Sequence, residues 1–152
     1  MDKLNLPEYT FRVNDLNNQK WIFDPLRKKK VVLTPEEWVR QNFIQFLIQE
    51  KHYPEQLIKV EMGFRVNNLI KRSDIIVYDR KGKPSLIVEC KAPTVKVSQG
   101  VFDQIARYNI SLKVDFLVVS NGLEHYCCQI NHQKKSYQFL RNIPEFEDLN
   151  QG

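Results

Sequence analysis

Two apolar runs joined by a short loop constrain the fold of this chain more than any other feature. Residues 72–79 (RSDIIVYD) and 85–91 (SLIVECK) have the apolar and β-branched composition of buried strands. The loop between them, residues 79–84 (DRKGKP), is short, which predicts neighbouring antiparallel strands. The second run ends in Glu89 and Lys91, two opposite charges at the end of an otherwise apolar strand.

Hydrophobic periodicity predicts the elements around this hairpin. A helix is predicted from Pro35, because Thr34 can cap it and Glu37 completes a T-x-x-E capping box. A second helix is predicted over residues 99–113, capped by Ser98. Further strands are predicted at residues 57–66, 115–120, 123–130 and 136–140, and shorter ones at 9–13 and 20–24. The order helix–three strands–helix–strand predicts an α/β (α+β) fold with a mixed central sheet flanked by helices.

Turns and termini complete this organisation. Asn121–Gly122 predicts a hairpin turn, and the Asn-rich residues 14–18 predict another. Residues 142–152 are predicted to form a polar, partly frayed tail. The basic run at residues 27–30 (RKKK) leaves two interpretations open, a solvated loop or a phosphate contact.

The composition is that of a globular chain with an anionic partner. The chain has 152 residues, 42% of them hydrophobic and 27% charged, and a net charge of +5. No apolar run approaches the ~20 residues of a membrane helix, and the N-terminus lacks the features of a secretory signal. We therefore expect a cytoplasmic protein with no membrane partner, and the positive charge favours nucleic acid. The three cysteines form no spacing typical of a disulfide framework or a zinc site.

The register of the central hairpin brings two carboxylates together. If the loop closes symmetrically around Lys81–Gly82, Asp74 lies opposite Glu89 on the same face of the sheet. Like charges at opposed strand positions are destabilising, so a cation is expected to offset them. Mg²⁺ is a suitable cation, because it prefers carboxylate oxygens as ligands. Lys91 lies two residues after Glu89 and therefore shares that face of the sheet.

A metal-dependent hydrolytic site would give each of these groups a task. Asp74 and Glu89 would hold the metal, and the carbonyl oxygen of Cys90 would be a further ligand. Lys91 would position or help to deprotonate the attacking water and stabilise the developing charge. The competing interpretation is an ordinary solvent-facing ion pair, since E-x-K is common on strands.

A second pair of residues lies on the helix that follows. Gln104 and Tyr108 are four residues apart and share a helix face. Apolar neighbours such as Val101 and Ile105 lie on or beside it, so this face is predicted to meet the sheet. Gln104 would then be a satisfied buried amide, an orienting partner of the carboxylates and lysine, or a contact to a nucleic-acid phosphate.

Together these motifs resemble the PD-(D/E)xK nuclease superfamily. The resemblance rests on Asp74, fourteen intervening residues, Glu89-Cys90-Lys91, and then the Q-x-x-x-Y pair. The stretches LTPEEWVRQNFIQFLI and VVSNGLEHY resemble the N-terminal nuclease domain of type I restriction enzyme R (HsdR) subunits. The likeness covers residues 31–130. It implies one domain over residues 1–152, with this core, an N-terminal strand extension at 1–30 and a C-terminal strand and tail at 131–152.

The resemblance also implies a function and a set of site residues. It implies a restriction-endonuclease-like fold and a DNA endonuclease that depends on Mg²⁺ or Mn²⁺. The residues carried over as catalytic are Asp74, Glu89, Lys91, Gln104 and Tyr108, and the metal ligands are Asp74, Glu89 and Cys90. An acidic residue of the first helix often completes such sites, and Glu37 is the best match, although its capping-box role competes with this.

Two departures from the family limit what the resemblance implies. Ser73 stands where the superfamily name has a proline, which is common among its members. The chain has no G-x-x-x-x-G-K-[ST] motif, so ATP-driven translocation is not expected of it. Specificity, modification or motor subunits of a restriction system are the partners that the resemblance suggests. The alternative function is a binding module for DNA or protein, with weak or no catalysis, in a restriction or repair complex.

Overall fold

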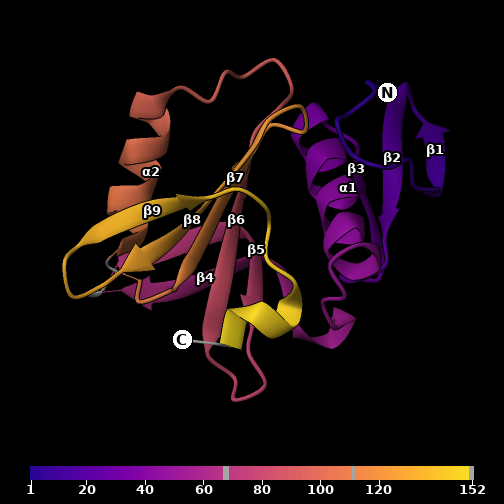
Figure 1. The fold of residues 1–152 in the computed structure, drawn as a ribbon. Helices are drawn as coiled ribbons and strands as arrows, with labels where there is room; N and C mark the ends of the chain where they lie inside the picture. Colours follow the sequence, from indigo (N-terminus) through magenta and orange to yellow (C-terminus); the bar gives the residue numbers. More distant parts are fainter. Residues whose placement is uncertain (67–68, 111, 151–152) are drawn as a thin grey trace.

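The centre of the molecule is a six-stranded mixed sheet. A computed structural model describes residues 1–66, 69–110 and 112–150, and the side chains of residues 1–60, 74–110 and 112–149. The strand order is β4-β5-β6-β7-β8-β9, and all neighbours are antiparallel except β6 and β7, which are parallel (Figure 1). The strands are β4 (Ile58–Val66), β5 (Leu69–Tyr78), β6 (Pro84–Cys90), β7 (Phe116–Ser120), β8 (His125–Asn131) and β9 (Ser136–Leu140).

One helix packs on each face of this sheet. Helix α1 (Pro35–Gln49) precedes the sheet in the chain, and α2 (Gln99–Ile110) forms the crossover between the parallel strands β6 and β7. Figure 1 shows the two helices on opposite sides of the strands. A mixed sheet with helices on its faces is the α+β architecture that the sequence predicts.

The alternation of side chains along the strands divides the core into two parts. Ile75, Val77 and Val88 are buried on the α1 side, where they pack with α1 residues such as Phe43 and Leu47. The residues between them on the same strands point to the α2 side. That second core consists mainly of Ile76, Ile87, Phe102, Ala106, Leu117, Val119 and Cys128. The central strands are therefore held rigidly from both faces.

Helix α1 begins as the sequence predicts. The Thr34 hydroxyl oxygen accepts the backbone N–H of Glu37 at 3.0 Å, and Pro35 occupies the first helical position. The predicted apolar face is buried at Val39 and the residues one and two turns further along. The start of α1, which carries Glu36 and Glu37, is thus fixed relative to the sheet.

A small antiparallel sheet precedes α1 and corrects the predicted position of the first strand. It consists of β1 (Val13–Leu16), β2 (Gln19–Asp24) and β3 (Lys29–Val32). The first strand was predicted at residues 9–13 but lies at 13–16. The reason is that the turn falls on Asn17 and Asn18, which have φ angles of 53° and 61°, a left-handed conformation that Asn tolerates and that two-residue hairpins favour.

The basic run before α1 is not the solvated loop of the first interpretation. Lys29 and Lys30 belong to β3, where they pair with Asp24 and Phe23 of β2. Arg27, in the β2–β3 turn, is largely buried in ion pairs. A phosphate contact by the exposed lysines stays a prediction.

The C-terminal segment is packed rather than frayed. A short 3₁₀ helix, η2 (Phe146–Asn150), buries Phe146 and Leu149 against the α1 side of the sheet. The Tyr53 ring meets Phe146 edge-on at 5.5 Å, and the Tyr53 hydroxyl donates to the carbonyl of Pro144 at 2.9 Å. Sequence reasoning gave too little weight to these two apolar residues, which lie three apart and share a helix face.

A second short 3₁₀ helix, η1 (Glu55–Leu57), follows α1. In the described part of the chain, no helix has the length and apolarity to span a membrane.

Candidate functional site

From Ile75 to Val77 the β5–β6 hairpin has the register that the symmetric loop predicts, although an irregularity between Val77 and Tyr78 shifts the register next to the loop. Ile75 pairs with Val88, Ile76 with Ile87 and Val77 with Leu86. Asp74 comes directly before this ladder on β5, and Glu89 directly after it on β6. The two residues therefore occupy opposed positions at the end of the ladder, as predicted, and Lys91 follows just beyond.

The Asp74 carboxylate is held by two different elements. Its Oδ2 accepts the backbone N–H of Cys90 at 2.7 Å, and its Oδ1 accepts a hydrogen bond from Nη2 of Arg40 at 2.8 Å. Arg40 lies on α1, 34 residues earlier in the chain. The Asp74 side chain is still 17% exposed, so it has access to solvent. Sequence reasoning missed Arg40, because its contact depends on how the helix docks on the sheet.

Glu37, the predicted acidic residue of the first helix, is buried and bonded to basic and amide groups. Its Oε1 accepts from Arg27 at 2.9 Å and from Arg40 at 2.6 Å, and its Oε2 accepts from Gln41 at 2.9 Å. These bonds replace the return half of the predicted capping box. Glu37 is therefore connected to Asp74 through Arg40, and its catalytic role stays a prediction.

Glu36, which sequence reasoning did not single out, contacts the same Arg40 nitrogen that binds Asp74. Its side chain is 47% exposed, and its Oε1 is 3.4 Å from Nη2 of Arg40. Partial burial and the negative charge of Asp74 raise the pKa of the Glu36 carboxyl, while Arg40 and Lys91 act in the opposite direction. Glu36, Asp74 and Lys91 are thus close enough to interact electrostatically.

The Cys90 thiol is influenced by the charges of the same side chains. Burial raises the pKa of this thiol well above its ordinary value, and the negative charges of Asp74, Glu89 and Glu36 raise it further. Glu89 is half-buried, as is Lys91, whose backbone N–H donates to the carbonyl of Ser120 at 2.8 Å. Three carboxylates from α1, β5 and β6 therefore act on one buried sulfur. The role predicted for the Cys90 carbonyl oxygen as a metal ligand stays a prediction.

The prediction that the Gln104–Tyr108 face of α2 meets the sheet is wrong. Gln104 is exposed, and Tyr108 is 50% exposed. The buried face carries Phe102, Ala106 and Asn109 instead. The Phe102 ring inserts into an aromatic cluster on β8 and β9, and this packing sets the rotation of the helix. Of the roles weighed for Gln104, exposure fits a nucleic-acid contact better than a buried amide.

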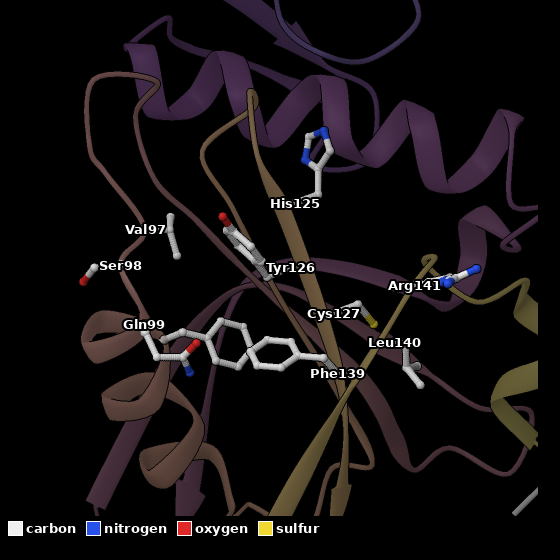
Figure 2. A pocket seen from close by; sticks show the side chains of 10 residues that line it. Val97, Ser98, Gln99, His125, Tyr126, Cys127, Phe139, Leu140 and Arg141 are labelled. Carbon is white, nitrogen blue, oxygen red and sulfur yellow. The ribbon is translucent and has the colours of Figure 1, made fainter.

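A cavity of about 460 Å³ lies between the start of α2 and the strands β8 and β9. Figure 2 shows its side chains, among them Gln99 from α2, Tyr126 from β8 and Phe139 from β9. Neither Asp74, Glu89 nor Lys91 lines it. The predicted site at the end of β5 and β6 therefore lies apart from this cavity.

The side chains at the end of β5 and β6 include oxygen donors of the kind that bind divalent cations. Among the described residues, no three His, Cys, Asp or Glu side chains are grouped closely enough to hold a metal ion. A carboxylate offers about four lone pairs, and Asp74 uses two of them in the bonds above. Its remaining lone pairs and the partly exposed Glu36 are hard oxygen donors, which suits Mg²⁺ with water and phosphate completing its shell. The oxygen donors present are thus of the kind that Mg²⁺ prefers, and the metal itself stays a prediction.

The chain resembles known proteins over most of its length. A family model described as "Type I restriction enzyme R protein N terminus" matches residues 35–144. No functionally curated protein matches the chain. A fragment structure assigned to an HsdR subunit of a type I restriction enzyme from Vibrio vulnificus YJ016 is similar, with a TM-score of 0.55 and 22% identity over 78% of this chain.

The match in structure concerns the fold, which is restriction-endonuclease-like, as predicted. The chain spans 25% of the length of the Vibrio chain. The family match includes α1, the β5–β6 hairpin, α2 and the loop at Asn121–Gly122, the parts on which the resemblance was based. By this match the chain belongs to the family of type I restriction enzyme R protein N termini.

Proposed function

We propose that the chain is a metal-dependent nuclease domain that hydrolyses phosphodiester bonds in DNA. The supporting observation is that the Asp74 carboxylate of β5 meets the backbone N–H of Cys90, next to Glu89, at 2.7 Å and shares Arg40 of α1 with Glu36. Asp74 and Glu89 stand at the end of the β5–β6 ladder, and Glu36 belongs to the first turn of α1. Membership of the restriction enzyme R family fits the same function.

Each side chain has a task in this proposal. Asp74 and Glu89 hold a divalent cation, with the Cys90 carbonyl oxygen as a further ligand. When bound, Mg²⁺ or Mn²⁺ supplies Lewis-acid stabilisation of the phosphate and acidifies a water molecule. Lys91 positions that water and stabilises charge on the phosphate. Glu36 supplies the carboxylate of the first helix, in place of Glu37.

The exposed residues of α2 and the basic surface serve DNA binding. Gln104 and Tyr108 carry donors on the solvent face of α2, where they can contact phosphates without reading sequence. The net charge of +5 favours the same polyanion. Specificity, modification and motor subunits of a restriction system are proposed as partners on the strength of the family alone.

The proposal is tested by incubating plasmid DNA with the protein in Mg²⁺ and in Mn²⁺. We expect nicking or linearisation that a chelator abolishes. Asp74→Asn and Lys91→Ala should each reduce the rate by about 10²-fold or more. Asp15→Asn in β1 and Lys81→Ala in the β5–β6 turn, at the opposite end of that hairpin from the site, change exposed residues of the same types and should leave it unchanged. Circular dichroism checks that each variant is folded.

The second candidate function is a binding module without catalysis. It is favoured by the engagement of both Asp74 oxygens with the chain's own donors and by the lack of a three-ligand group among the described residues. DNA binding by the wild type without cleavage in either metal would support this module and refute the nuclease. Cleavage that survives Asp74→Asn would place the chemistry elsewhere.

A further inference from the structure

Arg40 connects the first helix to the Asp74 carboxylate. Its Nη2 donates to Oδ1 of Asp74 at 2.8 Å and its Nη1 to Oε1 of Glu37 at 2.6 Å, and its side chain is only 5% exposed. We propose that Arg40 is a positioning residue, which fixes the orientation of Asp74 so that this carboxylate is presented to a divalent cation. This inference rests on the proposed nuclease function and adds a residue to it.

The two oxygens of Asp74 are fixed from opposite directions. Arg40 of α1 holds Oδ1, and the backbone N–H of Cys90 in β6 holds Oδ2 at 2.7 Å. One bond at each oxygen defines the plane of the carboxylate. Each oxygen keeps a second lone pair, so the arrangement orients the group without using up its capacity to bind a cation.

Arg40 is itself held in place by a chain of alternating charges. Its partner Glu37 also accepts from Arg27 at 2.9 Å and from Gln41 at 2.9 Å, and Arg27 is paired with Asp24 of β2. Although burial disfavours its charge, the bond to Asp74 and the charge of Glu37 raise the pKa of the Arg40 guanidinium. Arg40 is therefore expected to stay in place when a cation arrives, because leaving would cost the buried Glu37 one of its two guanidinium partners.

Three variants separate this role from general stability. Arg40→Met removes the contact to Asp74, and Arg40→Lys keeps the charge without the planar fork that can bridge two carboxylates. Arg27→Met is the matched control, because Arg27 contacts Glu37 and Asp24 but not Asp74. Two readouts are needed: hydrogen exchange of the Cys90 amide by NMR, which requires no metal, and the affinity for Ca²⁺ by calorimetry.

We expect Arg40→Met to speed exchange of the Cys90 amide and to weaken Ca²⁺ binding by about 10- to 100-fold, the usual effect of losing a group that orients a metal ligand. Arg40→Lys should lie between wild type and Arg40→Met. Arg27→Met should lower thermal stability yet leave both readouts within about twofold of wild type, since its partners are one step removed from Asp74.

Other outcomes overturn the inference. Equal losses in Arg27→Met and Arg40→Met would show that Arg40 acts only through stability. Tighter Ca²⁺ binding by Arg40→Met would show that Arg40 competes with the cation instead of preparing its ligand. If the wild type neither binds Ca²⁺ nor cuts DNA, the proposed nuclease function fails. The Cys90 amide still decides the role of Arg40 in that case: faster exchange in Arg40→Met supports it, and unchanged exchange refutes it.

Discussion

Glu36 and Glu37 are adjacent in sequence, but their carboxylates have different surroundings. Glu37 is buried and neutralised by Arg27 and Arg40, whereas Glu36 is 47% exposed and is influenced by Asp74 and Lys91. Successive residues of a helix point about 100° apart, so only one of them can face the end of β5 and β6. The structure gives that position to Glu36 and makes Glu37 a support for Arg40.

These surroundings predict opposite effects for two conservative substitutions. Glu36→Gln should slow DNA cleavage at least tenfold while changing the free energy of unfolding by less than about 0.5 kcal/mol, as is usual at exposed positions. Glu37→Gln should lower the free energy of unfolding by about 3 kcal/mol or more, because it removes the negative charge that pairs with two buried guanidinium groups. Urea denaturation and the plasmid assay measure the two quantities. A Glu36→Gln variant with full activity would remove Glu36 from the site.

Residue-scale features differ in how far the sequence predicts them. The opposition of Asp74 and Glu89 follows from the loop length, because a short hairpin fixes the register of its strands. The bond between Arg40 and Asp74 does not follow, because it depends on the position and rotation of α1 over the sheet. The difference in surroundings between Glu36 and Glu37 depends on the same rotation, which the capping-box pattern does not reveal.

At the scale of elements, the two helices show when a pattern predicts the buried face. In α1 the apolar stripe from Val39 to Leu47 is continuous, and the structure buries it. Helix α2 has two neighbouring apolar stripes. The sequence pattern predicts burial of the one with Val101 and Ile105, whereas the structure buries the one with Phe102 and Ala106. The stripe with Phe102 is buried because its bulky ring packs against Phe139, with ring centres 4.8 Å apart. Asn109 is tolerated on that buried face because its side-chain amide donates to the carbonyl of Ile105 at 2.8 Å.

The cap of α1 gives a prediction for the element that presents Glu36 and Arg40. Thr34→Ala removes the acceptor of the Glu37 N–H and should lower the free energy of unfolding by about 1 kcal/mol. Thr10→Ala, at an exposed position before β1, is the control and should change it by less than about 0.5 kcal/mol. Urea denaturation of both variants tests this. Equal effects of the two would mean that the Thr34 hydroxyl does not stabilise the start of α1.

At the scale of the whole molecule, the N-terminal segment is tied to the loop between β7 and β8. The backbone N–H of Asn5 donates to the carbonyl of Gly122 at 2.8 Å, and Nε2 of His125 is 2.9 Å from the carbonyl oxygen of Asn5. Burial lowers the pKa of His125, which favours a neutral ring that donates from Nε2 and accepts from Ser120 at Nδ1. The side chain of Leu4 is buried beside α1. No periodic pattern precedes residue 9, so this packing could not be predicted from the sequence.

Gly122 is the point where this segment, α1 and the loop come closest. Gly122 and Gly82 have φ angles of +87° and +85°, so alanine at either position costs about 1–2 kcal/mol of backbone strain. Only at Gly122 would the new Cβ meet other atoms, 2.7 Å from Cδ2 of Leu4 and 3.0 Å from Cγ2 of Val39. Gly122→Ala should therefore lower the free energy of unfolding by about 1–3 kcal/mol more than Gly82→Ala does. It should also make the first eight residues more susceptible to proteolysis, because Leu4 is the side chain most easily displaced. Urea denaturation and limited proteolysis of the two variants measure these effects, and equal losses with an unchanged N-terminal digest would show that Leu4 does not pack on Gly122.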